Sequence, residues 1–220
     1  MKMNDAPHEE ADPLADAEAV EIKKYLKSKL ILERYEHVLS VCDLAIDLAK
    51  IYYADWQKVK LAALLHDCAK WMSPLELYEA ALNYGIQVDE AQREKISLLH
   101  APIGAELARE LFGVTDPEIL NAIRNHTTGS GTMTLIDKIV WVADFAEPKR
   151  AHEEAALVRE LAYKYLNRAV FEVSRYKIQD LLSKGGTIHP DTVDSYNNTL
   201  REISASTPVW SKTKRVKPVL

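Results

Sequence analysis

The chain has 220 residues, a formal net charge of −5 and a hydrophobic content of 47%. This length fits one large domain or two small ones, and the apolar content excludes global disorder and supports a buried core. The mild acidity, with no strongly basic face, argues against a nucleic-acid polymer as a partner. No apolar run reaches the roughly 18 residues that a membrane span needs, which argues against a membrane protein.

The composition also favours helices and a reducing environment. The 7 glycines and 9 prolines are too few for a loop-rich β-sandwich, whereas Ala, Leu, Glu and Lys are abundant and favour helices. We therefore predict an all-α fold. Cys42 and Cys68 lie in apolar helical segments and are interpreted as buried thiols, not as a disulfide. With no signal-peptide pattern at the start of the chain, we expect a cytoplasmic location.

Hydrophobic periodicity predicts one helical domain over residues 18–206. Flexible tails are expected on both sides of it, an acidic one at 1–17 and a basic one at 207–220. The segment 152–184 is either one long helix or two consecutive ones. The predicted helices lie at 18–53, 56–69, 74–83, 89–97, 100–112, 117–126, 134–146, 152–184 and 190–204.

Start signals support several of these helix boundaries. Ser73 precedes Pro74, which pairs an N-cap residue with a proline in the first turn. Either Thr132 or Thr134 is expected to cap the helix near 134–146.

Two closely spaced glycines follow His126, in the stretch His126-Thr127-Thr128-Gly129-Ser130-Gly131. The backbone N–H groups of such a loop can bind a phosphate. A plain helix C-cap explains the same glycines, and the sequence favours neither interpretation.

Several histidines and aspartates fall at helix faces or ends that are directed inward. His66-Asp67 ends an apolar helical run, and His37 lies on the inward face of its predicted helix. Taken singly, each such residue is more often a hydrogen-bonded core residue or a helix cap than a metal ligand. Asp144 continues the apolar stripe of Val140, where an aspartate needs a cation or several donors.

Together these residues favour a metal site. Six candidates come from five predicted helices of one domain: His37, His66, Asp67, His100, His126 and Asp144. Imidazole and carboxylate ligands in a helical bundle suit Fe, Mn, Co or Zn. The order His, His-Asp, Asp resembles the HD-domain superfamily of metal-dependent phosphohydrolases, and the two additional histidines match its dinuclear branch.

The flanking residues resemble one family of that superfamily more closely, the YqeK family of symmetrical bis(5′-nucleosyl)-tetraphosphatases. The resemblance covers roughly residues 20–205, outside the two tails. Its motifs are Arg34-Tyr35-Glu36-His37, Leu64-Leu65-His66-Asp67-Cys68-Ala69-Lys70, His100-Ala101-Pro102-Ile103-Gly104, His126-Thr127-Thr128-Gly129, Ala143-Asp144-Phe145-Ala146-Glu147-Pro148 and His189-Pro190-Asp191-Thr192.

The resemblance implies an HD-domain helical bundle with a dinuclear metal site in its core. It also implies hydrolysis of diadenosine tetraphosphate to two ADP. Iron is the metal that the family implies, although the ligand types also permit Mn, Co or Zn. One ion would be held by His37, His66, Asp67 and Asp144. The second would be held by Asp67, His100 and His126, so that Asp67 bridges both.

The charge of such a site suggests how it would act. Two divalent ions outweigh two aspartates, so the site attracts polyphosphate and lowers the pKa of a shared water. We expect the resulting bridging hydroxide to attack a phosphorus. Lys70, one helical turn beyond His66, is assigned to catalysis together with Asp67, and also to substrate binding. The further candidates for substrate binding are Arg34, Thr127 and Arg150. Surface salt bridges or a helix cap are the alternative explanations for these four.

Other functions remain open at this point. The same metal site would serve another nucleotide phosphohydrolase, or a nucleotide-sensing protein that lacks turnover. A cyclic-dinucleotide phosphodiesterase is disfavoured because the expected Gly-Tyr-Pro motif is absent, and the oxygenase branch is disfavoured only by the flanking motifs. We expect a dinucleoside polyphosphate or nucleotide as the ligand, and a homodimer is an open option.

Overall fold

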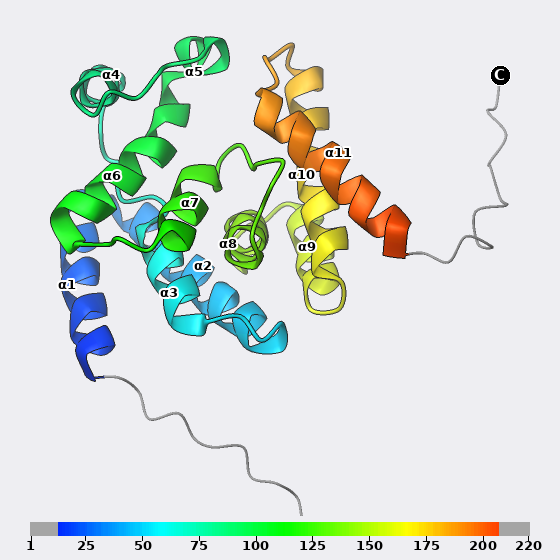
Figure 1. Ribbon diagram of the computed structural model, residues 1–220, viewed down its shortest axis with the longest axis horizontal. Coiled ribbons are helices and arrows are strands. Elements are labelled where there is room, and N and C mark those ends of the chain that lie inside the picture. The colour runs from blue at the N-terminus through cyan, green and yellow to red at the C-terminus, as the bar shows by residue number, and fades with distance from the viewer. Residues whose placement is uncertain (1–12, 207–220) are drawn as a thin grey trace, which may run out of the picture.

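The computed structural model describes residues 13–206, which contain helices and no strand (Figure 1). This confirms the predicted all-α fold. Within these residues, no helix is long and apolar enough to cross a membrane. The helices are α1 Pro13–Lys29, α2 Leu32–Ile51, α3 Trp56–Leu65, α4 Pro74–Asn83, α5 Glu90–Glu94, the 3₁₀ helix η1 Ile96–Leu99, α6 His100–Phe112, α7 Pro117–Asn125, α8 Leu135–Ala146, α9 Glu153–Ala162, α10 Leu166–Ser183 and α11 Pro190–Ser206.

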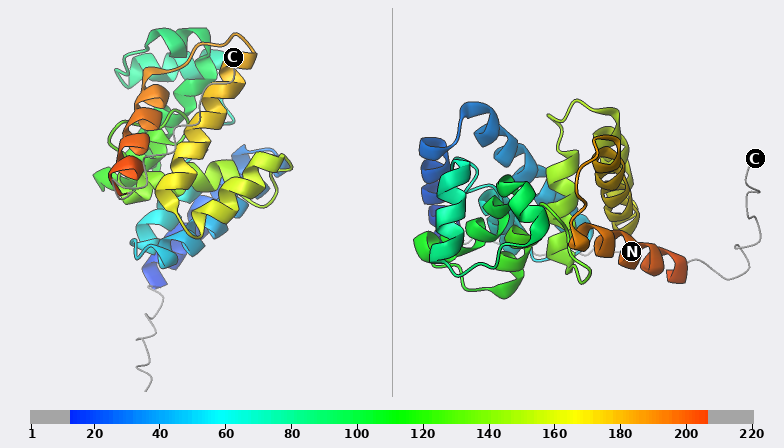
Figure 2. Two further views of the ribbon diagram at one scale, coloured as in Figure 1. Left: turned by 90° about the vertical axis from the view of Figure 1, so that its right-hand side faces the viewer. Right: turned by 90° about the horizontal axis from the view of Figure 1, so that it is seen from above.

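Helix α8 is the central element of the bundle and is seen end-on near the middle of Figure 1. It contacts α2, α3 and α7 on one side and α9 and α10 on the other. Helices α10 and α11 pack against each other along one flank (Figure 2), while α4 and η1 lie together beside α6. The bundle therefore brings helices from across the chain around α8.

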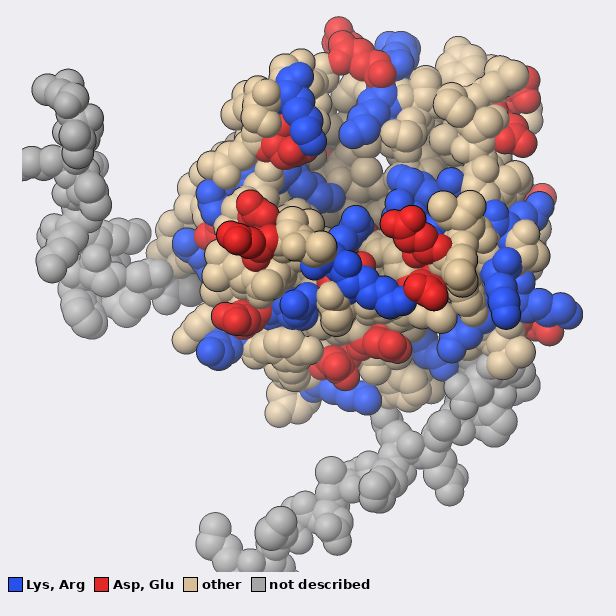
Figure 3. Space-filling view, turned by 180° about the vertical axis from the view of Figure 1, so that it is seen from behind, with Lys and Arg blue, Asp and Glu red and all other residues tan. Residues whose placement is uncertain are grey.

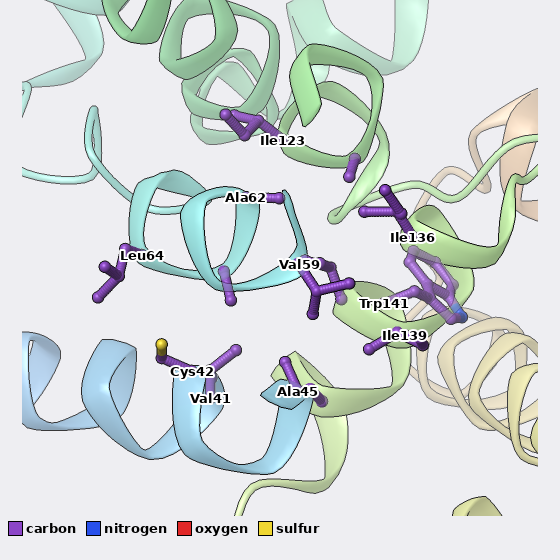
Figure 4. Close-up of a cluster of buried hydrophobic side chains, with 14 of the residues drawn as sticks. Val41, Cys42, Ala45, Val59, Ala62, Leu64, Ile123, Ile136, Ile139 and Trp141 are labelled. Atoms are coloured by element: carbon purple, nitrogen blue, oxygen red, sulfur yellow. The ribbon is translucent and has the colours of Figure 1, made fainter. Parts of the chain in front are cut away.

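The core between α2, α3, α7 and α8 is apolar and closely packed (Figure 4). Val41, Val59, Ile123 and Ile139 are fully buried there, as is the large side chain of Trp141. Burying such side chains stabilises the fold by roughly 1.5–3 kcal/mol each, before entropy is counted. The packed core fixes the ends of these four helices relative to one another.

The predicted helix 18–53 is wrong as a single element. The structure breaks it between Lys29 and Leu32, where Ile31 is extended with ψ 152° and provides no side-chain cap. Ile31 is also 73% exposed. No glycine or proline marks the break, which explains why the sequence pattern misses it. The bend lets α1 pack against α3 as well as α2.

Other boundaries differ less. The helix predicted at 56–69 ends at Leu65, and the segment 152–184 forms two helices, one of the two options left open. The short helix predicted at 89–97 is divided between α5 and η1. Helix α1 begins at Pro13, inside the tail predicted for 1–17. The rest of that tail and the one at 207–220 lie outside the described residues.

The predicted caps are confirmed in detail. The Ser73 hydroxyl accepts a hydrogen bond from Glu76 N, and the Glu76 carboxylate accepts one from Ser73 N. Of the two candidate threonines before α8, Thr134 is the cap, because its hydroxyl accepts from Asp137 N at 3.2 Å.

Thr134→Ala is expected to destabilise the protein by about 1 kcal/mol, the usual loss for an N-cap threonine. Urea unfolding followed by circular dichroism measures this. Thr132→Ala is the matched control, since the Thr132 side chain is exposed and does not cap α8. Equal losses in the two variants would contradict the assigned cap.

Candidate metal centre

The fold brings all six predicted residues together inside the bundle. His37 comes from α2, His100 begins α6, and Asp144 comes from α8. His66 and Asp67 follow the end of α3, and His126 follows the end of α7. The four imidazoles form a chain, with ring centroids 5.6 Å apart for His37–His66, 4.9 Å for His66–His126 and 5.0 Å for His100–His126.

The first cluster surrounds the Nε2 atoms of His37 and His66. His37 Nε2 lies 3.1 Å from Asp144 Oδ1. His66 Nε2 lies 3.9 Å from the same oxygen and 3.6 Å from Asp67 Oδ2. All of these side chains are largely withdrawn from solvent, so the cluster is an enclosed set of potential ligand atoms. His37, His66 and Asp67 have the spacing of a metal-binding group.

The second cluster surrounds the other oxygen of Asp67. Oδ1 of this carboxylate lies 3.2 Å from His100 Nε2 and 3.6 Å from His126 Nε2. These three residues also have metal-binding spacing and are buried. The two oxygens of Asp67 thus face different clusters, which is the arrangement required of a bridging carboxylate.

The hydrogen bonds of the imidazoles show that the residues fit metal ions. The Nδ1 atoms of His66 and His126 donate to the carbonyls of Ala63 and Ile123, each at 2.7 Å, and His100 Nδ1 donates to Ser97 O. In the neutral form of each ring this leaves the lone pair on Nε2, the atom that faces the centre.

Few hydrogen-bond donors reach these lone pairs. His66 Nε2 is buried without any hydrogen-bond partner among the described residues. His100 Nε2 and His126 Nε2 are only 3.1 Å apart, with a carboxylate oxygen beside them. The single Thr127 hydroxyl can donate to only one of these two nitrogens, and the Lys70 ammonium is 3.4 Å from His100 Nε2. Lone pairs and a carboxylate that converge in this way are stabilised by a cation, so the centre fits divalent ions at both clusters.

The pKa shifts of His66 and Asp67 suit metal binding as well. Burial lowers the pKa of His66 to about 4, which keeps that imidazole neutral. Burial alone would raise the pKa of Asp67, but the neighbouring His66, His100 and His126 hold it well below its usual range. Neutral imidazoles and ionised carboxylates are the forms that bind metal.

The four residues predicted to bind substrate also reach the centre. Arg34 lies 3.0 Å from Asp67 Oδ2, and an Arg150 nitrogen lies 3.3 Å from Asp144 Oδ1. The Lys70 ammonium is 3.4 Å from both ring nitrogens of His100. The Thr127 hydroxyl lies 3.1 Å from His126 Nε2 and 3.3 Å from His100 Nε2.

Sequence reasoning missed Glu147 as a part of this site. Its carboxylate is buried and accepts a hydrogen bond from His37 Nδ1 at 3.1 Å. Such a partner fixes the orientation and tautomer of a ligating histidine. The signal was available, because Glu147 follows Asp144 by three residues and therefore lies near it in space.

Sequence reasoning also missed Lys177, on α10. Its ammonium donates to the Thr127 carbonyl at 3.0 Å and lies 3.9 Å from the centre of the Trp141 ring. Burial lowers the pKa of Lys177 to about 8. No local pattern in α10 marks this lysine, since its role depends on a contact with a residue fifty positions earlier.

The glycine loop after His126 is explained by packing. Gly129 has φ +75° and its N–H donates to Asn125 O at 2.7 Å, which caps α7. A Cβ atom at Gly131 would meet the Asn198 side chain of α11 at 2.8 Å. The C-cap interpretation therefore accounts for Gly129, and close approach of α11 accounts for Gly131.

Comparisons with known proteins agree with this architecture. The HD domain family model matches residues 34–165. A symmetrical bis(5′-nucleosyl)-tetraphosphatase of Halalkalibacterium halodurans is 40% identical over 177 residues, covering 80% of this chain and 94% of that protein. The protein of the same name from Bacillus subtilis is 37% identical over 172 residues, covering 78% of this chain and 92% of that protein.

A solved structure is similar as well. It is a crystal structure from Clostridium acetobutylicum, described as a predicted HD superfamily hydrolase involved in NAD metabolism. It superposes with a TM-score of 0.81 at 35% identity, covering 84% of this chain and 97% of that chain. The chain thus belongs to the HD-domain family, in the group of the symmetrical bis(5′-nucleosyl)-tetraphosphatases.

Proposed function

We propose that this chain hydrolyses diadenosine tetraphosphate between its second and third phosphates and releases two ADP. The activity named for the relatives supports this proposal. The structural observation that carries it is the Asp67 carboxylate, whose two oxygens face two separate histidine clusters. A site of this kind suits two divalent ions acting on one phosphate group.

The proposed ligands are the six residues of the centre. His37, His66, Asp67 and Asp144 would hold one ion, and Asp67, His100 and His126 the other. When bound, two such ions lower the pKa of water and neutralise charge on phosphoryl oxygens. Iron is the metal that the family resemblance implies, and Mn, Co and Zn suit the same ligands.

The surrounding cations would bind and orient the phosphates. Arg34 and Arg150 are held at the centre by Asp67 and Asp144, so their guanidinium groups need little reorganisation to meet phosphate oxygens. Lys70 lies at the opposite cluster, beside His100. Burial lowers the pKa of the Lys70 ammonium, but an arriving polyphosphate would stabilise its charged form. Cationic side chains at both clusters would then stabilise the negative charge of the phosphates that lie between them.

The products of one turnover test the proposed reaction. Metal-loaded enzyme is incubated with diadenosine tetraphosphate, and the products are separated by anion-exchange chromatography. ADP alone is expected. ATP and AMP in equal amounts would show asymmetric cleavage, and a substrate left intact with every metal tried would refute the proposed activity.

Lys70→Ala is expected to lower turnover by about 10- to 1,000-fold, because a cation that stabilises the transferring phosphoryl group is lost. Metal content should persist, since Lys70 is not among the proposed ligands. Steady-state kinetics and elemental analysis measure the two quantities. Lys164→Ala is the matched control, an exposed lysine outside the site. Unchanged kinetics in Lys70→Ala would remove this residue from the reaction.

We also propose a cytoplasmic location. Cys42 and Cys68 are both buried free thiols. Unpaired buried cysteines are typical of reducing compartments.

A further inference from the structure

A cavity of about 500 Å³ lies between the α5–η1 segment and the α10–α11 end of the molecule. Such a volume is within the range of small-molecule sites, about 300–1,000 Å³. Figure 3 shows a hollow in the face opposite to that of Figure 1, with Lys and Arg side chains along its walls. Apolar side chains from three elements form part of the lining: Ala91, Leu98 and Leu181.

One wall of this cavity is shared with the metal centre. Thr127 lines the cavity, and its hydroxyl is within 3.3 Å of the Nε2 atoms of His100 and His126. Lys177 holds the Thr127 carbonyl, and the Thr192 hydroxyl donates to the Thr128 carbonyl at 2.8 Å. A ligand in the cavity would therefore lie directly beside the second cluster.

The charges in the cavity leave two cations available for an anion. Asp180 is paired with Lys184 at 2.7 Å, and Glu94 accepts a hydrogen bond from the Thr187 hydroxyl. Lys95 forms no ion pair within residues 13–206, and the neighbours of Lys177 are a carbonyl and an indole ring. These two ammonium groups meet no carboxylate of the cavity.

We propose that this cavity binds one nucleoside diphosphate half of the substrate. The base would lie against Leu98 and Leu181, and the phosphates would pass Lys95 and Lys177 towards Thr127 and the second cluster. The inference rests on the proposed function, because symmetrical cleavage leaves one nucleoside diphosphate on each side of the P–O–P bridge that is cleaved.

The other half has room on the side of the first cluster. A second cavity of about 420 Å³ is lined there by Arg34, His37 and Arg150. Its lining is richer in charged residues than that of the first cavity, and it contains no leucine. We therefore place base recognition in the leucine-lined cavity, whose α10–α11 wall lies beyond the matched segment 34–165.

The test measures binding of ADP and of inorganic pyrophosphate to the metal-loaded protein by isothermal titration calorimetry. Leu181→Trp fills the space for the base. It should weaken the binding of ADP at least about tenfold, the equivalent of 1.4 kcal/mol. Pyrophosphate has no base, so its binding should change less than about twofold. Leu182→Trp is the matched control, since Leu182 is 64% exposed and does not line the cavity.

A second variant tests the phosphate path without altering packing. Lys95→Gln removes an exposed ammonium group. It should weaken the binding of ADP and of pyrophosphate alike, by about three- to tenfold. Arg93→Gln is its control, an exposed cation two residues earlier that does not line the cavity. The melting temperature of each variant is measured to show that it folds.

The outcomes separate this inference from the proposed reaction. ADP affinity that is unchanged in both Leu181→Trp and Lys95→Gln would overturn the assigned cavity, even if the wild type cleaves diadenosine tetraphosphate. If Leu181→Trp weakened the binding of ADP and of pyrophosphate equally, the assigned cavity would also be overturned. The tryptophan would then not be displacing the base, which pyrophosphate lacks. Conversely, a wild type that binds ADP in this cavity but leaves the tetraphosphate intact would refute the reaction alone.

Discussion

Asp67→Ala is expected to lose both metal ions and to lower hydrolysis by about 10³-fold or more, the scale of removing a main electrostatic stabiliser. The reason is geometric. Oδ2 of Asp67 faces His66 in the first cluster, and Oδ1 faces His100 and His126 in the second. Elemental analysis of the purified variant, together with the product assay, measures both effects.

Asp47→Ala is the control for this variant, because Asp47 is an exposed carboxylate of α2 that belongs to neither metal-binding group. It should retain the wild-type metal content and activity. Two metal ions per chain in Asp67→Ala would show that the carboxylate does not bridge. One ion per chain would assign Asp67 to a single cluster.

The second large effect is a selective loss of one ion. His37→Ala removes a ligand of the first cluster only, and His126→Ala removes a ligand of the second only. Each variant should therefore hold about one ion per chain where the wild type holds two, with activity lowered by about 10²-fold or more.

His152→Ala is the control for the histidine variants. His152 caps α9 through its Nδ1, which accepts from Ala155 N at 3.1 Å. Its loss should cost about 1 kcal/mol of stability and leave the metal content unchanged. If His37→Ala and His126→Ala each lost both ions, the two clusters would have to be treated as one cooperative site.

Local signals predicted much of this fold correctly. Ser73-Pro74 and the threonine before α8 mark true helix starts, because capping depends on residues within one turn. The bend at Ile31 was not predictable in this way, since the residue has no intrinsic preference that forbids a helix. The break is set by packing of α1 on α3, which is a tertiary effect.

The same distinction applies to the site. Each of the predicted ligand residues is unremarkable alone, and only their number and order indicated a shared centre. Lys177 was missed because its role comes from a partner at long sequence distance, Thr127. Glu147 was missed although its position three residues after Asp144 was a usable local signal. The break after Leu65 similarly places His66 and Asp67 in turns instead of on a continuous helix.

The support that α10 and α11 give to the Thr127–Thr128 turn has a consequence for biosynthesis. A ribosome-bound chain that has emerged as far as residue 165 already carries all six histidines and aspartates of the centre. It still lacks Lys177 and Thr192, which hold the two carbonyls of that turn. Because domains fold as their segments emerge, the wall between the second cluster and its cavity is completed only after residue 192. Nascent chains that end between these two points therefore carry every proposed ligand but lack contacts that hold this wall in place.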